Sequence, residues 1–150
     1  MIKADMSLAI LKSRAQLGIE APSVSIKVHL SNGLPGLSIV GLPEAAVKES
    51  KDRVRSAIIN SGFNFPNKRI TINLAPADLL KSSGRFDLPI ALGVLYASRQ
   101  INPTKKIDDY KFAGELSLSG KLRKISSAIS MAIKCVQNNK KLIIPLQNEK

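Results

Sequence analysis

Two short segments of the chain alternate strictly between apolar and polar residues, and this pattern limits the fold more than any other feature. They are residues 24–30 (VSIKVHL) and 70–74 (ITINL). A period of two places all apolar side chains on one face of a strand and all polar ones on the other. The chain is therefore predicted to contain a half-buried sheet. His29, the only histidine, falls on the polar face, so we interpret it as a solvated residue rather than a catalytic base.

Two neighbouring segments are predicted to extend this sheet. Residues 8–15 are apolar and tolerate β structure, and residues 37–40 form a short apolar segment after the turn residues of 31–36. Asn and Gly in that turn can adopt positive φ, as tight hairpins require. We therefore expect residues 37–40 to form a hairpin with residues 24–30.

Three helices are predicted from apolar spacings of three and four. The first opens at Pro43 and ends at Gly62, with a stripe formed by Val47, Ser50, Val54, Ile58 and Ser61. The second covers residues 87–98, with Asp87 as N-cap and with Gly93 marking close packing. The third covers residues 126–138, and its apolar side is Ile129, Ala132, Ile133 and Val136.

The remaining strands lie in the second half of the chain. Residues 112–118 are predicted to pair with residues 122–125 through a turn at Gly120, and residues 142–145 form a last short buried strand. The resulting order of strands and helices predicts a single α+β domain with helices packed on a mixed sheet.

The charge of the chain is strongly positive. Lys and Arg number 23 against 11 Asp and Glu, a formal net charge of +12, and more than half of the excess lies in residues 99–150. Such clustering is typical of a surface that contacts a phosphate backbone, and a solvated lysine-rich face is the alternative.

Several classes of protein are excluded. The longest apolar run, residues 88–97, covers only about half of a ~30 Å hydrocarbon core as a helix. The N-terminus lacks the continuous apolar region of a signal peptide, so we expect a cytoplasmic protein without a membrane partner. Cys135 is the only cysteine, which excludes an internal disulfide and a multi-cysteine metal site.

The chain also lacks the common signatures of catalysis. The nearest match to a phosphate-binding loop is residues 114–122 (GELSLSGKL), whose glycine spacing is one residue too long and whose context is a turn. No Gly-x-Ser-x-Gly motif occurs, and Asp108–Asp109 is interpreted as a capping or solvated pair. We therefore expect no catalytic residue, cofactor or metal in this chain.

Four stretches carry a family resemblance: SLAILKSRAQLGIEAP, VHLSNGLPGLSIVGLPEAAVKESKDRVRSAIINSGF, KRITINLAPADLLKSSGRFDLPIALGVL and AGELSLSGKLRKI. Together they resemble the N-terminal domain of the ComM/YifB family, the bacterial magnesium-chelatase-like AAA+ proteins linked to competence and DNA processing. The resemblance implies that residues 1–150 are a single Lon-protease-like domain with a left-handed βαβ crossover. The AAA+ ATPase module and C-terminal region of the family would be absent from this chain, so ATP and magnesium are expected in that missing module.

The resemblance also bears on peptidase chemistry, which in active Lon-type proteases needs a serine nucleophile and a lysine. The equivalent loop here is residues 83–88 (SGRFDL), with no serine at the nucleophile position, and Ile129 stands where the lysine would be. Ser82 and Ser83 are out of register. The Ser-Lys mechanism is therefore unavailable to this chain.

The function implied is a non-catalytic domain of an ATP-driven protein of DNA recombination, branch migration and natural transformation. It would act in assembly, in DNA guidance or in partner contact, next to its own AAA+ module and neighbouring subunits of a hexamer. The alternatives are a chelatase-related ATPase subunit that inserts magnesium into a tetrapyrrole, and a degenerate Lon-type module that binds peptides.

DNA is an expected partner, and six basic residues are the candidate phosphate contacts: Lys51, Arg53, Arg55, Lys121, Arg123 and Lys124. An alternative remains for the helix, because Lys48, Lys51 and Arg55 stand at helical spacing from acidic residues. These are Glu44, Glu49 and Asp52.

Overall fold

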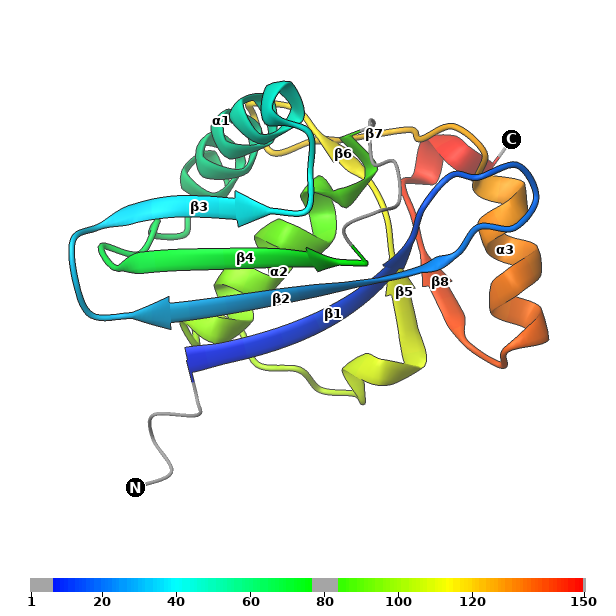
Figure 1. The fold of residues 1–150 in the computed structure, drawn as a ribbon, viewed down its shortest axis with the longest axis horizontal. Helices are drawn as coiled ribbons and strands as arrows, with labels where there is room; N and C mark the ends of the chain where they lie inside the picture. Colours follow the sequence, from blue (N-terminus) through cyan, green and yellow to red (C-terminus); the bar gives the residue numbers. More distant parts are fainter. Residues whose placement is uncertain (1–6, 77–83, 150) are drawn as a thin grey trace.

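The computed structural model describes residues 7–76 and 84–149, and Figure 1 shows its elements. Its strands are β1 (Leu8–Arg14), β2 (Ser23–Ser31), β3 (Gly36–Val40), β4 (Arg69–Ala75), β5 (Tyr110–Phe112), β6 (Glu115–Leu116), β7 (Leu122–Arg123) and β8 (Lys141–Ile143). Its helices are α1 (Glu44–Asn60), α2 (Asp87–Ala97) and α3 (Ala128–Gln137), with short 3₁₀ turns η2 (Gly84–Phe86), η3 (Ile107–Asp109) and η4 (Leu146–Glu149). The α+β class predicted from the sequence is confirmed.

The main sheet has four strands in the order β1-β2-β4-β3. The hairpin predicted between β2 and β3 is wrong, because β4 lies between them. Ile70 of β4 pairs with Leu30 of β2 on one side and with Leu37 of β3 on the other. The alternating β4 has an apolar face to bury, and pairing with β2 on one side and β3 on the other satisfies the hydrogen bonds of both its edges. β3 and β4 run parallel and are joined through α1.

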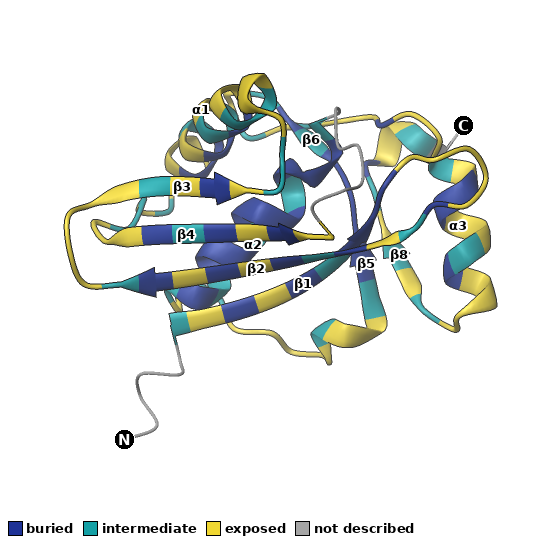
Figure 2. Ribbon diagram, viewed as in Figure 1, coloured by how far each residue is buried: buried dark blue, intermediate teal, exposed yellow. Residues whose placement is uncertain are grey.

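One face of this sheet is covered and the other is open, as the alternation predicted. Figure 2 shows α2 behind the strands, and the core joins α1, α2 and the inner face of the sheet. Gly93 of α2 packs so tightly that an added Cβ would lie 2.5 Å from Val28 Cγ2, which confirms the close approach predicted there. On the open face Lys27 and His29 are exposed, so the interpretation of His29 as a solvated residue is confirmed.

The predicted stripe of α1 is confirmed in its central part. Ser50, Val54 and Ile58 are buried, and Val47 packs partly buried against the same core. The basic residues of this helix therefore lie on its other faces, with the exception of Arg53, which is described below.

The long strand predicted at residues 112–118 is instead two strands with different partners. β5 pairs in parallel with β8, and β6 pairs antiparallel with β7. The chain turns between them at Gly114, whose N–H donates to the Arg85 carbonyl and whose carbonyl accepts from the Leu88 N–H. One hydrogen bond to η2 and one to the start of α2 therefore replace strand pairing at this point.

The predicted inner side of α3 is also wrong. Ile129, Ile133 and Val136 are 77%, 51% and 79% exposed, whereas Met131 and Cys135 on the other side are buried. Both sides of this helix carry apolar residues, so periodicity alone did not decide which one faces the core. Cys135 is 2% exposed, which confirms its interpretation as a packing residue.

Within residues 7–76 and 84–149, none of the helices is both long enough and apolar enough to cross a membrane.

Candidate functional site

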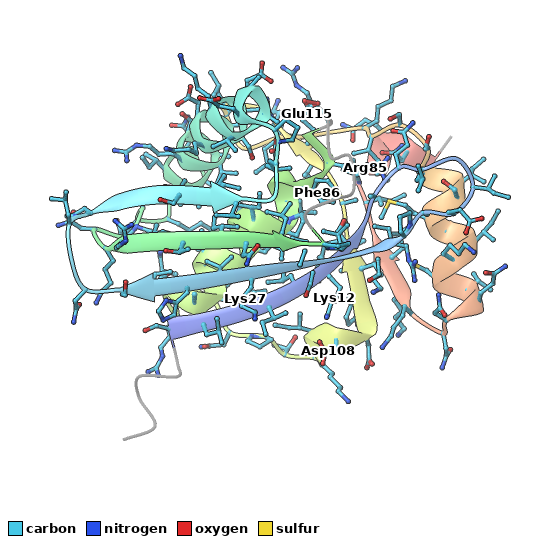
Figure 3. All side chains as sticks on the ribbon, viewed as in Figure 1. Lys12, Lys27, Arg85, Phe86, Asp108 and Glu115 are labelled. Atoms are coloured by element: carbon cyan, nitrogen blue, oxygen red, sulfur yellow. The ribbon has the colours of Figure 1, made fainter. Side chains whose placement is uncertain are left out.

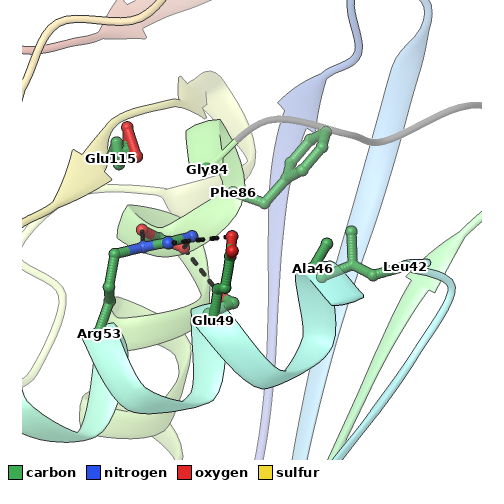
Figure 4. Close-up of a pocket in the computed structure, with 9 residues that line it drawn as sticks. Leu42, Ala46, Glu49, Arg53, Gly84, Phe86 and Glu115 are labelled. Carbon is green, nitrogen blue, oxygen red and sulfur yellow. Dashed lines mark hydrogen bonds and ion pairs between the residues drawn. The ribbon is translucent and has the colours of Figure 1, made fainter. Parts of the chain in front are cut away.

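The Asp87 carboxylate lies at the centre of a buried polar network. Asp87 belongs to residues 83–88, the segment compared above with the loop of Lon-type proteases. Its side chain is 1% exposed. Oδ1 accepts hydrogen bonds from Ser50 Oγ (2.8 Å) and Arg53 Nη2 (3.3 Å), and Oδ2 accepts from Arg53 Nε (2.6 Å) and the backbone N–H of Leu116 (3.1 Å). These four bonds connect α1, α2 and β6. Figure 4 labels Arg53 and Glu49 on α1 at this site.

The prediction that Asp87 caps α2 is wrong. Asp87 is the first residue of the helix, Phe86 stands at the N-cap position, and no side-chain bond caps the N-terminus. Its carboxylate is used instead for contacts that are distant in sequence. Burial raises the pKa of Asp87, while the bonds from Arg53, Leu116 and Ser50 act in the opposite direction. The hydrogen bond to Asp87 in turn raises the pKa of Arg53.

Arg85, two residues before Asp87, ties a different part of the fold together. It is 1% exposed, and its guanidinium donates to the backbone carbonyls of Arg14 (3.2 Å) and Ser126. It therefore connects the end of β1 to the segment that leads into α3, and Figure 3 labels it near the end of β1. Burial lowers the pKa of Arg85.

These roles of Arg85 and Asp87 escaped the sequence analysis, which gave neither a partner. One signal was available: Arg85 and Asp87 stand on the two sides of Phe86, at the start of a helix that is apolar nearly all round. A second signal was Ser50 inside the apolar stripe of α1, where a hydroxyl needs a buried partner. Neither signal identifies which distant residues meet.

A cavity of about 270 Å³ adjoins the Asp87 network. It is lined by Leu42, Ala46, Glu49, Ser50 and Arg53 of the first helix region, together with Gly84, Phe86, Asp87 and Glu115. Ser50, the residue with a hydroxyl in the described lining, donates to Asp87 Oδ1, and the same carboxylate joins α1, α2 and β6. The arrangement is that of a structural clamp.

The residues compared with the Ser-Lys dyad are placed as follows. None of the described loop residues 84–88 is a serine, and Ile129 is 77% exposed on α3, so in the described part of the chain neither position offers a nucleophile or a base. Ser82 and Ser83 lie outside the described residues.

Residues 114–122 form a hairpin. The sequence predicted a turn here rather than a phosphate-binding loop. β6 and β7 pair antiparallel around a turn in which Gly120 has φ +96° and its N–H donates to the Ser117 carbonyl. A helix does not follow the first strand here, so the geometry that cradles phosphate in such loops is not formed. Across residues 7–76 and 84–149, no three His, Cys, Asp or Glu side chains gather as a metal site would need.

The three candidate phosphate contacts on α1 have different surroundings. Arg53 is held by Asp87 and lies 3.7 Å from Glu49, and its side chain is only 21% exposed. Arg55 is exposed, with its guanidinium 5.0 Å from the centre of the Phe65 ring, and Lys51 is half-buried beside it. In the described ranges both ion pairs within 4 Å belong to Arg53, so the pairings considered for Lys48, Lys51 and Arg55 are not formed there.

The other three candidates lie together just after the hairpin turn, and all are exposed: Lys121, Arg123 and Lys124. The turn rests on the C-terminal end of α1. Asn60 donates from Nδ2 to the Leu118 carbonyl (2.7 Å), and a Cβ added to Gly120 would lie 2.4 Å from Ser61 Oγ. The fold therefore holds this turn against the helix that carries Lys51 and Arg55.

A family model described as subunit ChlI of Mg-chelatase matches residues 26–148. The Escherichia coli K12 protein YifB, itself described as uncharacterized, is 55% identical over 96% of the chain, and the Haemophilus influenzae competence protein ComM is 53% identical over 95%. A Mycobacterium bovis protein is 35% identical over 95%. The chain spans 28% of the length of each of these relatives.

Proposed function

Because the chain belongs to the family described as subunit ChlI of Mg-chelatase, and is homologous to the N-terminal 28% of YifB and ComM, we propose that it is a non-catalytic domain of a DNA-processing AAA+ ATPase. The observation that carries the proposal is 53% identity to a competence protein over 95% of the chain. In the complete protein, ATP and magnesium would belong to the AAA+ module. This domain would guide DNA or contact a partner within a hexameric ring.

Five of the six candidate basic residues support a DNA contact. Lys121, Arg123 and Lys124 are exposed on a turn that α1 holds in place, and Lys51 and Arg55 lie on that helix without a recorded carboxylate partner within the described ranges. Lysine and arginine held in this way can displace counterions from a phosphate backbone. Arg53 is left out of the proposal because Asp87 holds its guanidinium.

The DNA contact is tested by fluorescence anisotropy with labelled single-stranded, duplex and four-way-junction DNA between about 50 and 200 mM salt. We expect the logarithm of the association constant to fall linearly with the logarithm of the salt concentration. In the double variant Lys121→Gln/Lys124→Gln the salt slope should fall by roughly two, since each phosphate contact contributes about 0.9.

The matched control is Lys105→Gln/Lys106→Gln, which removes two exposed charges from the loop before η3. The control should keep the wild-type slope. Absence of binding at low salt, or an equal loss in both variants, would contradict the role of the turn in DNA contact.

The family description itself favours a second candidate, a chelatase-type ATPase subunit that inserts magnesium into a tetrapyrrole. An assay of the complete protein with ATP and a porphyrin substrate distinguishes the chelatase function from the DNA-processing function. Magnesium insertion, followed by the change in the porphyrin absorption spectrum, would support the chelatase and count against the DNA-processing proposal.

We extend the proposal to the detailed fold, for which the resemblance implies a Lon-protease-like domain with a left-handed crossover. The unit concerned is β3–α1–β4, whose strands are parallel neighbours joined through a helix. Right-handed connections prevail in such units, so a left-handed one would be distinctive. An experimental structure with a right-handed β3–α1–β4 connection would contradict the assignment.

A further inference from the structure

A second positively charged region lies away from the surface discussed above, between β1, β5 and the residue that precedes β8. It is an open cavity of about 620 Å³ lined by three lysines, Lys12, Lys111 and Lys140. Ser23 of β2 also lines it, and among the described residues Asp108 of η3 is the carboxylate in its wall. Figure 3 shows Lys12 and Asp108 at this side of the sheet.

Lys111 is the unusual member, because it is 6% exposed. Its Nζ donates to Ser23 Oγ (3.2 Å), and the nearby Lys12 Nζ donates to Ser25 Oγ (3.2 Å). In the described ranges no carboxylate lies within 4 Å of either amine, since both ion pairs recorded there involve Arg53. A buried charge balanced only by a hydroxyl is costly. An anion in the cavity would remove that cost.

We propose that this cavity binds the phosphate group of a nucleotide. The lysines surround the phosphate, and the Ser23 hydroxyl, which accepts from Lys111, keeps its own proton to donate to a phosphate oxygen. At the rim Leu8 and Ile10 are 42% and 37% exposed and offer an apolar surface for a base. The volume lies within the ~300–1,000 Å³ typical of small-molecule sites.

The site shares no residue with the basic turn and α1 surface, so the two proposals stand or fall separately. Phosphate can reach it as a free nucleotide or as part of a single strand, and the recognising chemistry is the same. Asp108 is exposed and acidic, so it repels an anion in the cavity. Removing its charge should therefore strengthen binding of the anion.

The test is a titration of the isotopically labelled 150-residue chain, in phosphate-free buffer, followed by amide NMR shifts at Lys12, Ser23 and Lys111. AMP should move these resonances and adenosine should not. A 5′-phosphorylated decathymidylate that moves them identifies strand phosphate as a source, and AMP alone identifies a free nucleotide. No shift with AMP or the strand, or the same shifts with a poly-glutamate peptide, would overturn the proposal.

Three variants sharpen this test. Lys111→Met should weaken AMP binding about tenfold or more, which corresponds to the loss of a hydrogen bond to a charged group. Asp108→Asn should bind AMP more tightly than wild type. Lys48→Met, an exposed lysine on α1, is the control and should bind as wild type. Equal affinity in Lys111→Met and the control would contradict the site.

Lys111→Met also gives a stability prediction that needs no ligand. Burial, then the charges of Arg14 and Lys12, lower the pKa of Lys111; Lys140 acts in the same direction and Cys135 in the opposite one. Asp108 also faces the cavity. At neutral pH the variant should unfold at a higher temperature than wild type, because it removes a buried charge.

The pH dependence of that gain follows from linkage. Between the lowered folded-state pKa of Lys111 and the ordinary value of 10.5, the folded chain binds fewer protons than the unfolded chain, so wild-type stability rises with pH. The advantage of Lys111→Met is therefore full below the folded-state pKa and disappears as the pH approaches 10.5. Calorimetry at several pH values measures it, and a variant less stable than wild type at neutral pH would contradict the uncompensated charge.

Discussion

Replacing Asp87 with alanine is expected to destabilise the domain by about 3–5 kcal/mol, the cost of removing one partner of a buried ion pair. The substitution leaves the Arg53 guanidinium without its closest acceptor, and it leaves the Ser50 hydroxyl and the Leu116 N–H without their carboxylate. All three bonds join α1 or β6 to α2. Urea unfolding followed by circular dichroism measures the loss.

The matched control is Glu49→Ala, which removes the other carboxylate near Arg53. That carboxylate is 71% exposed and lies at 3.7 Å, so its loss should cost less than about 1 kcal/mol. If Asp87→Ala does not fold, Asp87→Asn keeps the shape and removes only the charge, and it should still be clearly less stable than Glu49→Ala. Similar stabilities of the Asp87 and Glu49 variants would show that the clamp contributes little.

Gly41→Ala is expected to have the second large effect, about 3 kcal/mol or more. Gly41 joins β3 to α1 with φ +100°, a conformation that costs a residue with a Cβ roughly 1–3 kcal/mol. The added Cβ would also lie 2.1 Å from the Leu74 carbonyl oxygen, so the backbone of β4 or of the connection must move. Overpacking of this kind adds about 1–3 kcal/mol. Thermal and urea unfolding measure the total.

Gly62→Ala separates the two contributions. Gly62 has a similar φ of +90°, but nothing lies within 4 Å of the position of its Cβ. It should therefore show only the conformational cost, roughly 1–3 kcal/mol, and less loss than Gly41→Ala. Equal losses at Gly41 and Gly62 would mean that the contact with β4 relaxes freely and that the close approach has no energetic weight.

The strand order could not be predicted from local sequence patterns. The alternation in β2 and β4 predicted the buried face of each strand, and the register keeps Val28 opposite Ile72. Local turn residues between β2 and β3 suggested a hairpin, but the pairing of a strand depends on every other strand that competes for its edge. β4 comes 29 residues after the end of β3, which is too far for any local pattern to report.

The candidate site shows the same limit in its charged residues. The exposed lysines near Gly120 were identified correctly as residues of a turn, because turn chemistry is local. Arg53 was predicted to contact phosphate, whereas the fold brings it to Asp87, 34 residues away in sequence. The sequence did not single out Lys111, because its burial depends on how β5 packs beside β1.

By itself the sequence determined the half-buried strands, the extent of α1 and α2, the α+β class, and the family to which the chain belongs. These properties depend on the residue period and on contiguous motifs, which are written along the chain. Only the tertiary structure decided the position of β4, the inward side of α3, and the partners of Asp87, Arg85 and Lys111. Each of these depends on which surfaces meet across long sequence separations, where burial, hydrogen bonding and charge are satisfied together and no local pattern specifies the partner.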